Sequence, residues 1–300
     1  MSSICVLRKM VGLFAIVRGY NLFLLMVSQY SAAYFIFGGG SPLKKILNDD
    51  ALHLLILAST CSVAAGYLIN NFYDSEKDSI NEPFRARIYY FVGQGLVFRL
   101  YLLLNLLALG CSVWVSWKAL IFFLFYQLGI WLYSHKISRM ALWNNLTATV
   151  LTVMPFFILL IRYQNFHISV FVYACFLFLL LLIKDVLKDL STQRGDLLFD
   201  YYTLPLKYGE KATKYVVSIL TILFMFNALL LTFYVKEGLI KYYFFLSALL
   251  VGISLTLLWG IHSEKYYRLV LIFYTVLIFF GVCCISLMGV EYLNLHKCFP

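Results

Sequence analysis

Charged residues are scarce in this chain. Asp, Glu, Lys and Arg together make up 13% of its 300 residues, whereas apolar residues make up 63% and aromatic residues 18%. So little polar surface cannot cover a water-soluble globular domain of this size. The composition therefore excludes an ordinary soluble protein and predicts a single integral-membrane domain over residues 1–300.

Cysteine pairs with the spacing of a metal or redox site are also lacking. The 7 cysteines lie mostly within apolar runs, and no two of them form a C-x-x-C pair. Neither a disulfide framework nor a zinc site is expected. We interpret these cysteines as small apolar packing residues.

Long polar stretches are absent, and short charged segments divide the chain into apolar runs. A helix needs about 20 apolar residues to cross a bilayer. Nine runs approach that length, which predicts an all-α, polytopic membrane protein with nine transmembrane helices. The runs are 11–37, 51–73, 92–114, 119–133, 142–161, 170–187, 216–235, 242–261 and 267–288.

The formal net charge of +10 does not indicate a nucleic-acid partner, because the Lys and Arg residues are spread over segments between the runs. Most of them fall on the cytoplasmic side if the N-terminus is cytoplasmic. The positive-inside rule then predicts a cytoplasmic N-terminus and a C-terminus on the opposite side. In a bacterium, the membrane would be the inner membrane.

Acidic residues are few, and most of them follow two of the apolar runs. If the second run continues as a helix beyond residue 73, Asn70, Asp74 and Asp78 share one helix face. After the sixth run, Asp189 and Asp196 lie seven residues apart, so a continued helix returns them to nearly the same face. The two segments contain Asp74, Glu76, Asp78, Glu82, and Asp185, Asp189, Asp196, Asp200, Glu210.

Solvated helix ends explain one such acidic cluster well. Two clusters that each combine stacked acids with basic residues suit a ligand that needs both, such as a magnesium diphosphate. A transporter would instead place ionisable groups near the middle of the bilayer, often in broken helices. A non-catalytic scaffold has no need of two acidic motifs.

The first acidic segment, "NNFYDSEKDSINEPFR", resembles the N-D-x-x-D-x-x-x-D motif of the UbiA-type intramembrane prenyltransferases. Asn70, Asp74 and Asp78 match this motif, and Asn71 stands where the family usually has aspartate. The tail that follows, Asn81, Pro83 and Arg85, is similar to the family's proline and arginines.

The second segment, "KDLSTQRGDLLFDYYTLPLKYG", is similar to K-D-x-x-D-x-x-G-D followed by T-L-P. This form occurs in the branch that includes the geranylgeranylglyceryl phosphate and chlorophyll-type enzymes. Lys188, Asp189, Gly195 and Asp196 match it. Thr192 replaces an aspartate, and Asp200 replaces a common glycine.

Two weaker likenesses accompany these motifs. "RGYN", ending at Asn21, resembles the family's R-P-x-N on its first helix. "YSHKISRMALWNN" resembles a family loop whose asparagine matches Asn145 and whose lysine falls on Ser138. Lys136 or Arg139 could supply the missing positive charge there.

The resemblance implies nine helices around a central cavity that opens sideways into lipid. It also implies a Mg²⁺-dependent transfer of a prenyl group from an isoprenoid diphosphate, with Asp74, Asp78, Asp189 and Asp196 as catalytic residues. The implied metal ligands are Asn70, Asp74, Asp78, Asp189 and Asp196. The implied substrate-binding residues are Asn21, Asn70, Asn71, Arg85, Arg139, Asn145, Lys188 and Thr192.

The acceptor is expected to be a lipophilic molecule, and the form of the second motif favours a lipid alcohol such as geranylgeranylglyceryl phosphate, with a geranylgeranyl donor. An aromatic acceptor of the quinone or tetrapyrrole pathways is the main alternative. A non-catalytic membrane protein that binds prenyl diphosphates is another, because Asn71 and Thr192 remove two carboxylates and should weaken magnesium binding.

Overall fold

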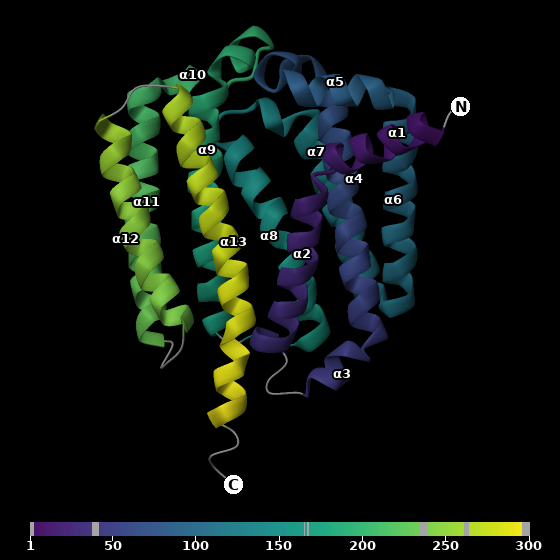
Figure 1. Ribbon diagram of the computed structural model, residues 1–300, viewed down its shortest axis with the longest axis vertical. Coiled ribbons are helices and arrows are strands. Elements are labelled where there is room, and N and C mark those ends of the chain that lie inside the picture. The colour runs from purple at the N-terminus through teal and green to yellow at the C-terminus, as the bar shows by residue number, and fades with distance from the viewer. Residues whose placement is uncertain are drawn as a thin grey trace. The chain divides into compact units, whose positions relative to one another are not determined.

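The protein is all helical throughout the residues that the computed structural model describes, which are 3–37, 42–164, 166, 168–234, 239–260 and 264–295. The prediction of an all-α protein is therefore confirmed (Figure 1). The chain forms two compact units that are interleaved in sequence. The first unit is Met1–Val27, Asn48–Thr147 and Arg194–Tyr202, and the second is Ser28–Leu47, Ala148–Gln193 and Thr203–Pro300.

The first unit is built around α4 (Asp50–Asn81), a helix of 32 residues. The carboxylate of Asp49 caps its start by accepting a hydrogen bond from the Leu52 amide at 3.2 Å. Its end is set by Pro83, which occupies the first turn of the next helix, where a missing N–H costs nothing. The other elements are α1 (Ser3–Ile16), most of α2 (Gly19–Ser31), α5 (Pro83–Val92), α6 (Gln94–Val115), α7 (Trp117–His135), the 3₁₀ turn Ile137–Arg139, the start of α8 and the end of α9.

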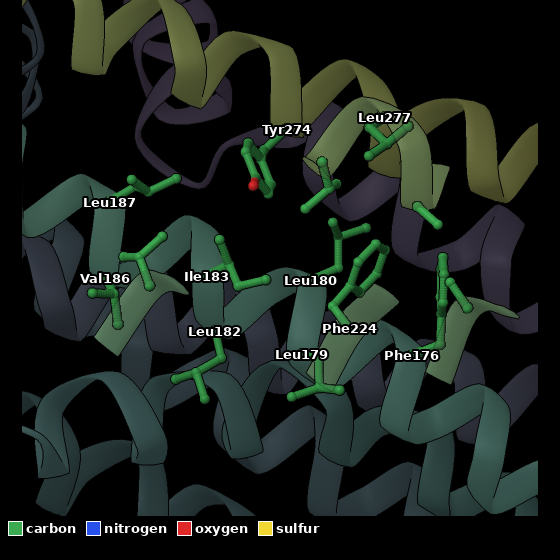
Figure 2. Packing of buried hydrophobic residues seen from close by; sticks show 14 of the residues in the cluster. Phe176, Leu179, Leu180, Leu182, Ile183, Val186, Leu187, Phe224, Tyr274 and Leu277 are labelled. Carbon is green, nitrogen blue, oxygen red and sulfur yellow. The ribbon is translucent and has the colours of Figure 1, made fainter. Parts of the chain in front are cut away.

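The second unit has its core on α9 (Ile168–Leu198), α11 (Glu210–Tyr234), α12 (Leu239–Gly260) and α13 (Glu264–Leu295). Figure 2 shows Ile183 and Leu180 of α9 facing Phe224 of α11 and Tyr274 of α13. Close packing of this kind, rather than exclusion of water, holds helices together in lipid. The unit also contains the π-helical turn Ala32–Phe37, α3 (Leu43–Leu47), most of α8 (Trp143–Tyr163) and α10 (Leu204–Tyr208).

Seven of the described helices are long and apolar enough to cross a membrane, and an eighth span results if one bent pair of helices is counted as one. The predicted number of nine is not confirmed. The run 119–133 forms α7, which is not among these helices. Two predicted boundaries, Val235 and Ile261, lie outside the described residues.

The first apolar run is not one continuous helix, as the sequence predicts it to be. It bends by 57° between Arg8–Ile16 and Gly19–Phe37. At the bend, Arg18 takes a left-handed backbone conformation with φ of 51°, which an L-residue adopts only at a cost in energy. Arg18, Gly19 and Asn21 interrupt the apolar pattern at this point, but the apolar residues on both sides together make a run long enough for a single span.

The two acidic segments lie on helices that extend well beyond their apolar runs. α4 continues to Asn81 and α9 continues to Leu198. Both continuations confirm the prediction from the spacing of the acids. Asn70, Asp74 and Asp78 are therefore stacked on successive turns of α4, and Asp189 and Asp196 lie about two turns apart on α9.

Candidate active site

Carboxylates from α4 and from the end of α9 converge on one lysine. The ammonium of Lys77 lies 3.4 Å from Asp74 Oδ2 and 3.9 Å from Asp196 Oδ1. Asp74 is 8% exposed and Asp196 is 2% exposed. Burying two carboxylates costs free energy unless a cation and hydrogen bonds compensate. The first and second motifs therefore share one point of charge compensation.

Tyr201 lies at the same point, although no charge or spacing pattern in the sequence singles it out. Its hydroxyl donates to Asp74 Oδ1 at 2.6 Å. The Lys77 ammonium lies 3.8 Å from the centre of its ring, and the Arg139 guanidinium lies 5.3 Å from it. Burial and the negative charge of Asp74 raise the pKa of Tyr201. Its hydroxyl therefore stays protonated and acts as a donor.

Asn70 and Asp78 extend the cluster along α4. The Asn70 amide donates to Asp74 Oδ2 at 2.7 Å, so Asp74 receives oriented donors on both oxygens. Asp78 lies one turn further on and is half-buried. The charges of Asp74 and Arg85 both act on its carboxylate. These three residues fall where the sequence places the first motif.

Gly195 allows the second motif to approach α4 closely. Its amide donates to Asn81 Oδ1 at 3.1 Å. A Cβ atom on residue 195 would lie 2.5 Å from Asn81 Oδ1 and Nδ2, which is closer than real contacts allow. The matching glycine and asparagine of the two motifs therefore form a direct tie between α4 and α9.

Asn71 has a structural role that its place in the motif does not indicate. Its amide nitrogen donates to the Tyr67 carbonyl at 2.6 Å and to the Ile16 carbonyl at 3.3 Å. The second bond ties α4 to the last residue of α1, next to the bend. An aspartate could not donate either bond.

Asp200 replaces a family glycine at a position where the backbone is left-handed, with φ of 56°. Aspartate is one of the few non-glycine residues that adopt this conformation readily. The turn that follows α9 brings the Tyr201 amide to the Asp196 carbonyl at 2.9 Å and the Tyr202 amide to the Arg139 carbonyl at 3.0 Å. Aspartate is therefore compatible with the turn that positions Tyr201.

The remaining predicted residues of the first unit lie at different places. Arg85 is paired with Glu82 at 3.2 Å, and Arg139 is exposed but reaches over Tyr201. Asn21 donates weakly to the Tyr67 hydroxyl at 3.4 Å. Asn145 is buried at the start of α8, where its predicted contact with substrate stays a prediction.

Lys188, Asp189 and Thr192 belong to the second unit. Lys188 is exposed, Asp189 is buried, and the Thr192 hydroxyl donates to the Lys188 carbonyl at 3.3 Å. Their part in binding metal or substrate stays a prediction.

The donor set around Lys77 suits a hard divalent cation such as Mg²⁺, which prefers carboxylate and amide oxygens. Asp74 and Asp196 already share one cationic group, the Lys77 ammonium. Among the described residues, no three acidic, histidine or cysteine side chains are arranged as a ready-made metal site. A bound diphosphate would supply the further oxygen ligands that such an ion takes.

A comparison with known protein families matches residues 24–282 to the UbiA prenyltransferase family. The chain belongs to this family. It is therefore a prenyltransferase, and its apolar helices make it an integral membrane protein.

Several curated relatives are digeranylgeranylglyceryl phosphate synthases. The enzyme of Saccharolobus solfataricus is 26% identical over 203 residues, which cover 67% of this chain and 71% of the relative. The enzyme of Methanosphaera stadtmanae is 28% identical over 64% of this chain and 71% of the relative. That of Pyrococcus horikoshii is 24% identical over 72% and 75%.

Solved structures share the fold. A digeranylgeranylglyceryl phosphate synthase superposes with a TM-score of 0.71 at 19% identity, over 94% of this chain and 99% of that one. A UbiA homologue from Archaeoglobus fulgidus, bound to GPP and Mg²⁺, superposes with a TM-score of 0.65 at 13% identity, over 92% and 99%.

The structural role of Asn71 predicts the effect of giving this UbiA-family chain the family's usual residue. Asn71→Asp removes two donated hydrogen bonds and places a carboxylate against two carbonyl oxygens, at a cost of about 1–3 kcal/mol. We expect a lower melting temperature in detergent and no gain in activity. Thr192→Asp is the matched replacement in the other motif, and its melting temperature should be close to that of the wild type. Equal or higher stability of Asn71→Asp would contradict the role given to its amide.

The tie between Gly195 and Asn81 predicts a coupled pair of substitutions. Gly195→Ala should destabilise the protein by about 1–3 kcal/mol, because the new methyl group displaces the Asn81 amide. In Gly195→Ala combined with Asn81→Ala the clash is gone, so the two losses should not add. Gly110→Ala is the control, since a Cβ there meets nothing within 4 Å. Strict additivity in thermal unfolding would rule out the contact.

Proposed function

We propose that this UbiA-family enzyme transfers a prenyl group from an isoprenoid diphosphate to a hydroxyl of a glycerophosphate-type lipid, with geranylgeranyl as the donor group. The observation that carries the proposal is the convergence of Asp74 and Asp196 on Lys77. It places acids of both motifs around one cation. The names of the curated relatives support the acceptor class.

We propose Mg²⁺ as the cofactor, held by Asn70, Asp74, Asp78 and Asp196, with Asp189 added on the strength of the motif. The Mg²⁺ in the Archaeoglobus fulgidus homologue supports this choice. A bound metal ion acts as a Lewis acid that stabilises negative charge on the departing diphosphate. Tyr201 and Asn70 fix the orientation of Asp74, so that its oxygens need little rearrangement when they bind the ion.

The basic side chains of the site neutralise the same leaving group. Lys77 already lies between the acids of the two motifs, and Arg139 lies over Tyr201. Arg85 acts on Asp78 through its charge. We propose that Lys77 and Arg139, with Lys188, stabilise the diphosphate as it leaves.

In the proposed reaction, the allylic C–O bond to the diphosphate breaks and the diphosphate keeps the electron pair. The acceptor hydroxyl oxygen forms a new C–O bond to the same carbon and gives its proton to the departing diphosphate. No protein nucleophile is required. The allyl cation must be kept from water and stabilised by π electrons, and the 27 Phe and 23 Tyr residues of the chain are suited to both tasks.

We propose that the active-site loops and the N-terminus face the cytoplasm and that the C-terminus lies on the opposite side. The distribution of Lys and Arg between the segments supports this orientation. The donor would then enter from the cytoplasmic side of the membrane.

Substitution of Asp74 tests the proposed function. The experiment supplies purified protein with geranylgeranyl diphosphate, geranylgeranylglyceryl phosphate and Mg²⁺, and measures the ether product by mass spectrometry. Asp74→Asn should lower kcat by about 10²-fold or more, because it removes charge from the site that stabilises the leaving group. Asp50→Asn, at the exposed opposite end of α4, should leave kcat unchanged. Absence of product from the folded wild type would contradict the proposed reaction.

Tyr201→Phe tests the orientation of Asp74. Losing a hydrogen bond to a charged group costs about 1.5–3 kcal/mol, so the Mg²⁺ concentration for half-maximal rate should rise about tenfold. Tyr202→Phe is the matched control, because the Tyr202 side chain is exposed. Equal magnesium dependence of the two variants would show that the Tyr201 hydroxyl does not position Asp74.

A further inference from the structure

Two buried polar atoms on α5 have no hydrogen-bond partner. They are Arg85 Nε and the Tyr89 hydroxyl, four residues apart and therefore on one face of the helix. Tyr89 is 1% exposed. Buried polar groups are nearly always paired, so two unpaired donors on one helix face call for an explanation.

Arg18 brings a second positive charge toward the same place. Its guanidinium lies 5.3 Å from the centre of the Tyr67 ring. It has no carboxylate partner in the part of the chain that the structure describes. Burial lowers the pKa of Arg85, and the like charge of Arg18 lowers it further.

The packing of α1 against α5 brings the chain segment that carries Arg18 toward Arg85. A Cβ on Gly12 of α1 would lie 3.0 Å from Val92 and 3.2 Å from Ile88 of α5. Ile16 and Tyr89 belong to one buried cluster. The two helices run in opposite directions (Figure 1), so the end of α1 lies beside the start of α5.

We propose that Arg18, Arg85 and Tyr89 form a subsite for the phosphate group of the acceptor lipid. This inference rests on the proposed function, because it names where the glycerophosphate part of that acceptor binds. A phosphate carries two negative charges and several acceptor oxygens. It would relieve the repulsion between the two guanidinium groups and accept hydrogen bonds from both unpaired donors.

We expect the donor diphosphate to bind at the acids of the two motifs, because a diphosphate is held through a metal ion. Asp74, Asp78 and Asp196 provide the carboxylates through which a metal ion holds a diphosphate. The arginine pair is hydrogen-bonded to one acid among the described residues, Glu82, which pairs with Arg85 at 3.2 Å, whereas Asp78 acts on Arg85 through its charge. Cationic groups alone suit a phosphate that is bound without metal.

The surroundings of the arginine pair fit a ligand with a lipid tail. α1 and α5 expose large apolar side chains next to the proposed subsite, which a membrane interface would cover. A lipid could lie along these side chains while its phosphate reaches the arginines. The exposed residues are Met10, Val11 and Phe14 of α1, and Phe84, Tyr90 and Phe91 of α5.

The test compares two acceptors, geranylgeranylglyceryl phosphate and geranylgeranylglycerol, which lacks the phosphate. Tyr89→Phe removes only the unpaired hydroxyl. Arg18→Asn removes the charge with a residue that tolerates a left-handed backbone. Each variant should raise KM for the phosphorylated acceptor about tenfold, because a hydrogen bond to a charged group is lost. KM for geranylgeranyl diphosphate and the kinetics with the free alcohol should not change.

Arg87→Gln is the control, since Arg87 is an exposed arginine on the same helix. It should leave every constant unchanged. An equal rise in KM for both acceptors, or a higher KM for geranylgeranyl diphosphate, would overturn the proposed subsite. A merely structural Tyr89 hydroxyl would give Tyr89→Phe with unchanged kinetics and equal or higher thermal stability, which also overturns it.

A binding measurement without Mg²⁺ or donor separates this inference from the proposed function. Radiolabelled geranylgeranylglyceryl phosphate should bind the wild type in detergent about tenfold more tightly than Arg18→Asn, whether or not product forms. Excess phosphatidic acid should compete poorly. Equal competition by phosphatidic acid would mean that the arginines hold any lipid phosphate, and equal binding by wild type and variant would rule out the subsite.

Discussion

The repulsion between buried carboxylates is the constraint on which this site depends. Asp74 and Asp196 come from different helices and lie together in a poorly solvated place, where an uncompensated charge would cost several kcal/mol. Lys77, Tyr201 and Asn70 offset that cost by supplying a cation and two donated hydrogen bonds. The same carboxylates remain suited to a stronger cation, so the arrangement that stabilises the fold also prepares the site for a metal-bound diphosphate.

The supporting structure keeps the acids in place. α4 and α9 both continue beyond their apolar runs, which puts the acids past the lipid-facing turns. The contact between Gly195 and Asn81 fixes how closely the two helix ends approach. The left-handed turn at Asp200 then brings Tyr201 back to Asp74.

Spacing along a helix predicts the part of the site that lies on one helix face. Asn70, Asp74 and Asp78 follow the helical repeat, so their stacking follows from the order of the residues alone. Tyr201 cannot be found in this way, because it reaches Asp74 through a turn and across 127 residues of sequence. The break at Arg18 also escapes prediction, because the apolar residues on either side of Arg18, Gly19 and Asn21 together make a run long enough for one span. The helix α5 is not predicted either, because its mixture of polar and apolar residues does not form an apolar run long enough to cross a membrane.

The departures from the family motif illustrate the limits of motif comparison. Asn71 suggests a lost metal ligand when only its motif position is considered, yet its amide ties α4 to the end of α1. Asp200 stands at the place of a motif glycine and has a left-handed backbone, which aspartate tolerates. Both residues meet a local backbone requirement, so neither one on its own predicts an inactive protein.

The most direct test of the carboxylate site uses Mn²⁺ as a paramagnetic substitute for Mg²⁺, titrated into the purified wild type and followed by electron paramagnetic resonance. The account predicts that geranylgeranyl diphosphate tightens Mn²⁺ binding to the protein, because the diphosphate and the acids complete one coordination sphere. If the protein does not retain Mn²⁺ even with the diphosphate present, the acids around Lys77 are not a metal site and the central claim is wrong.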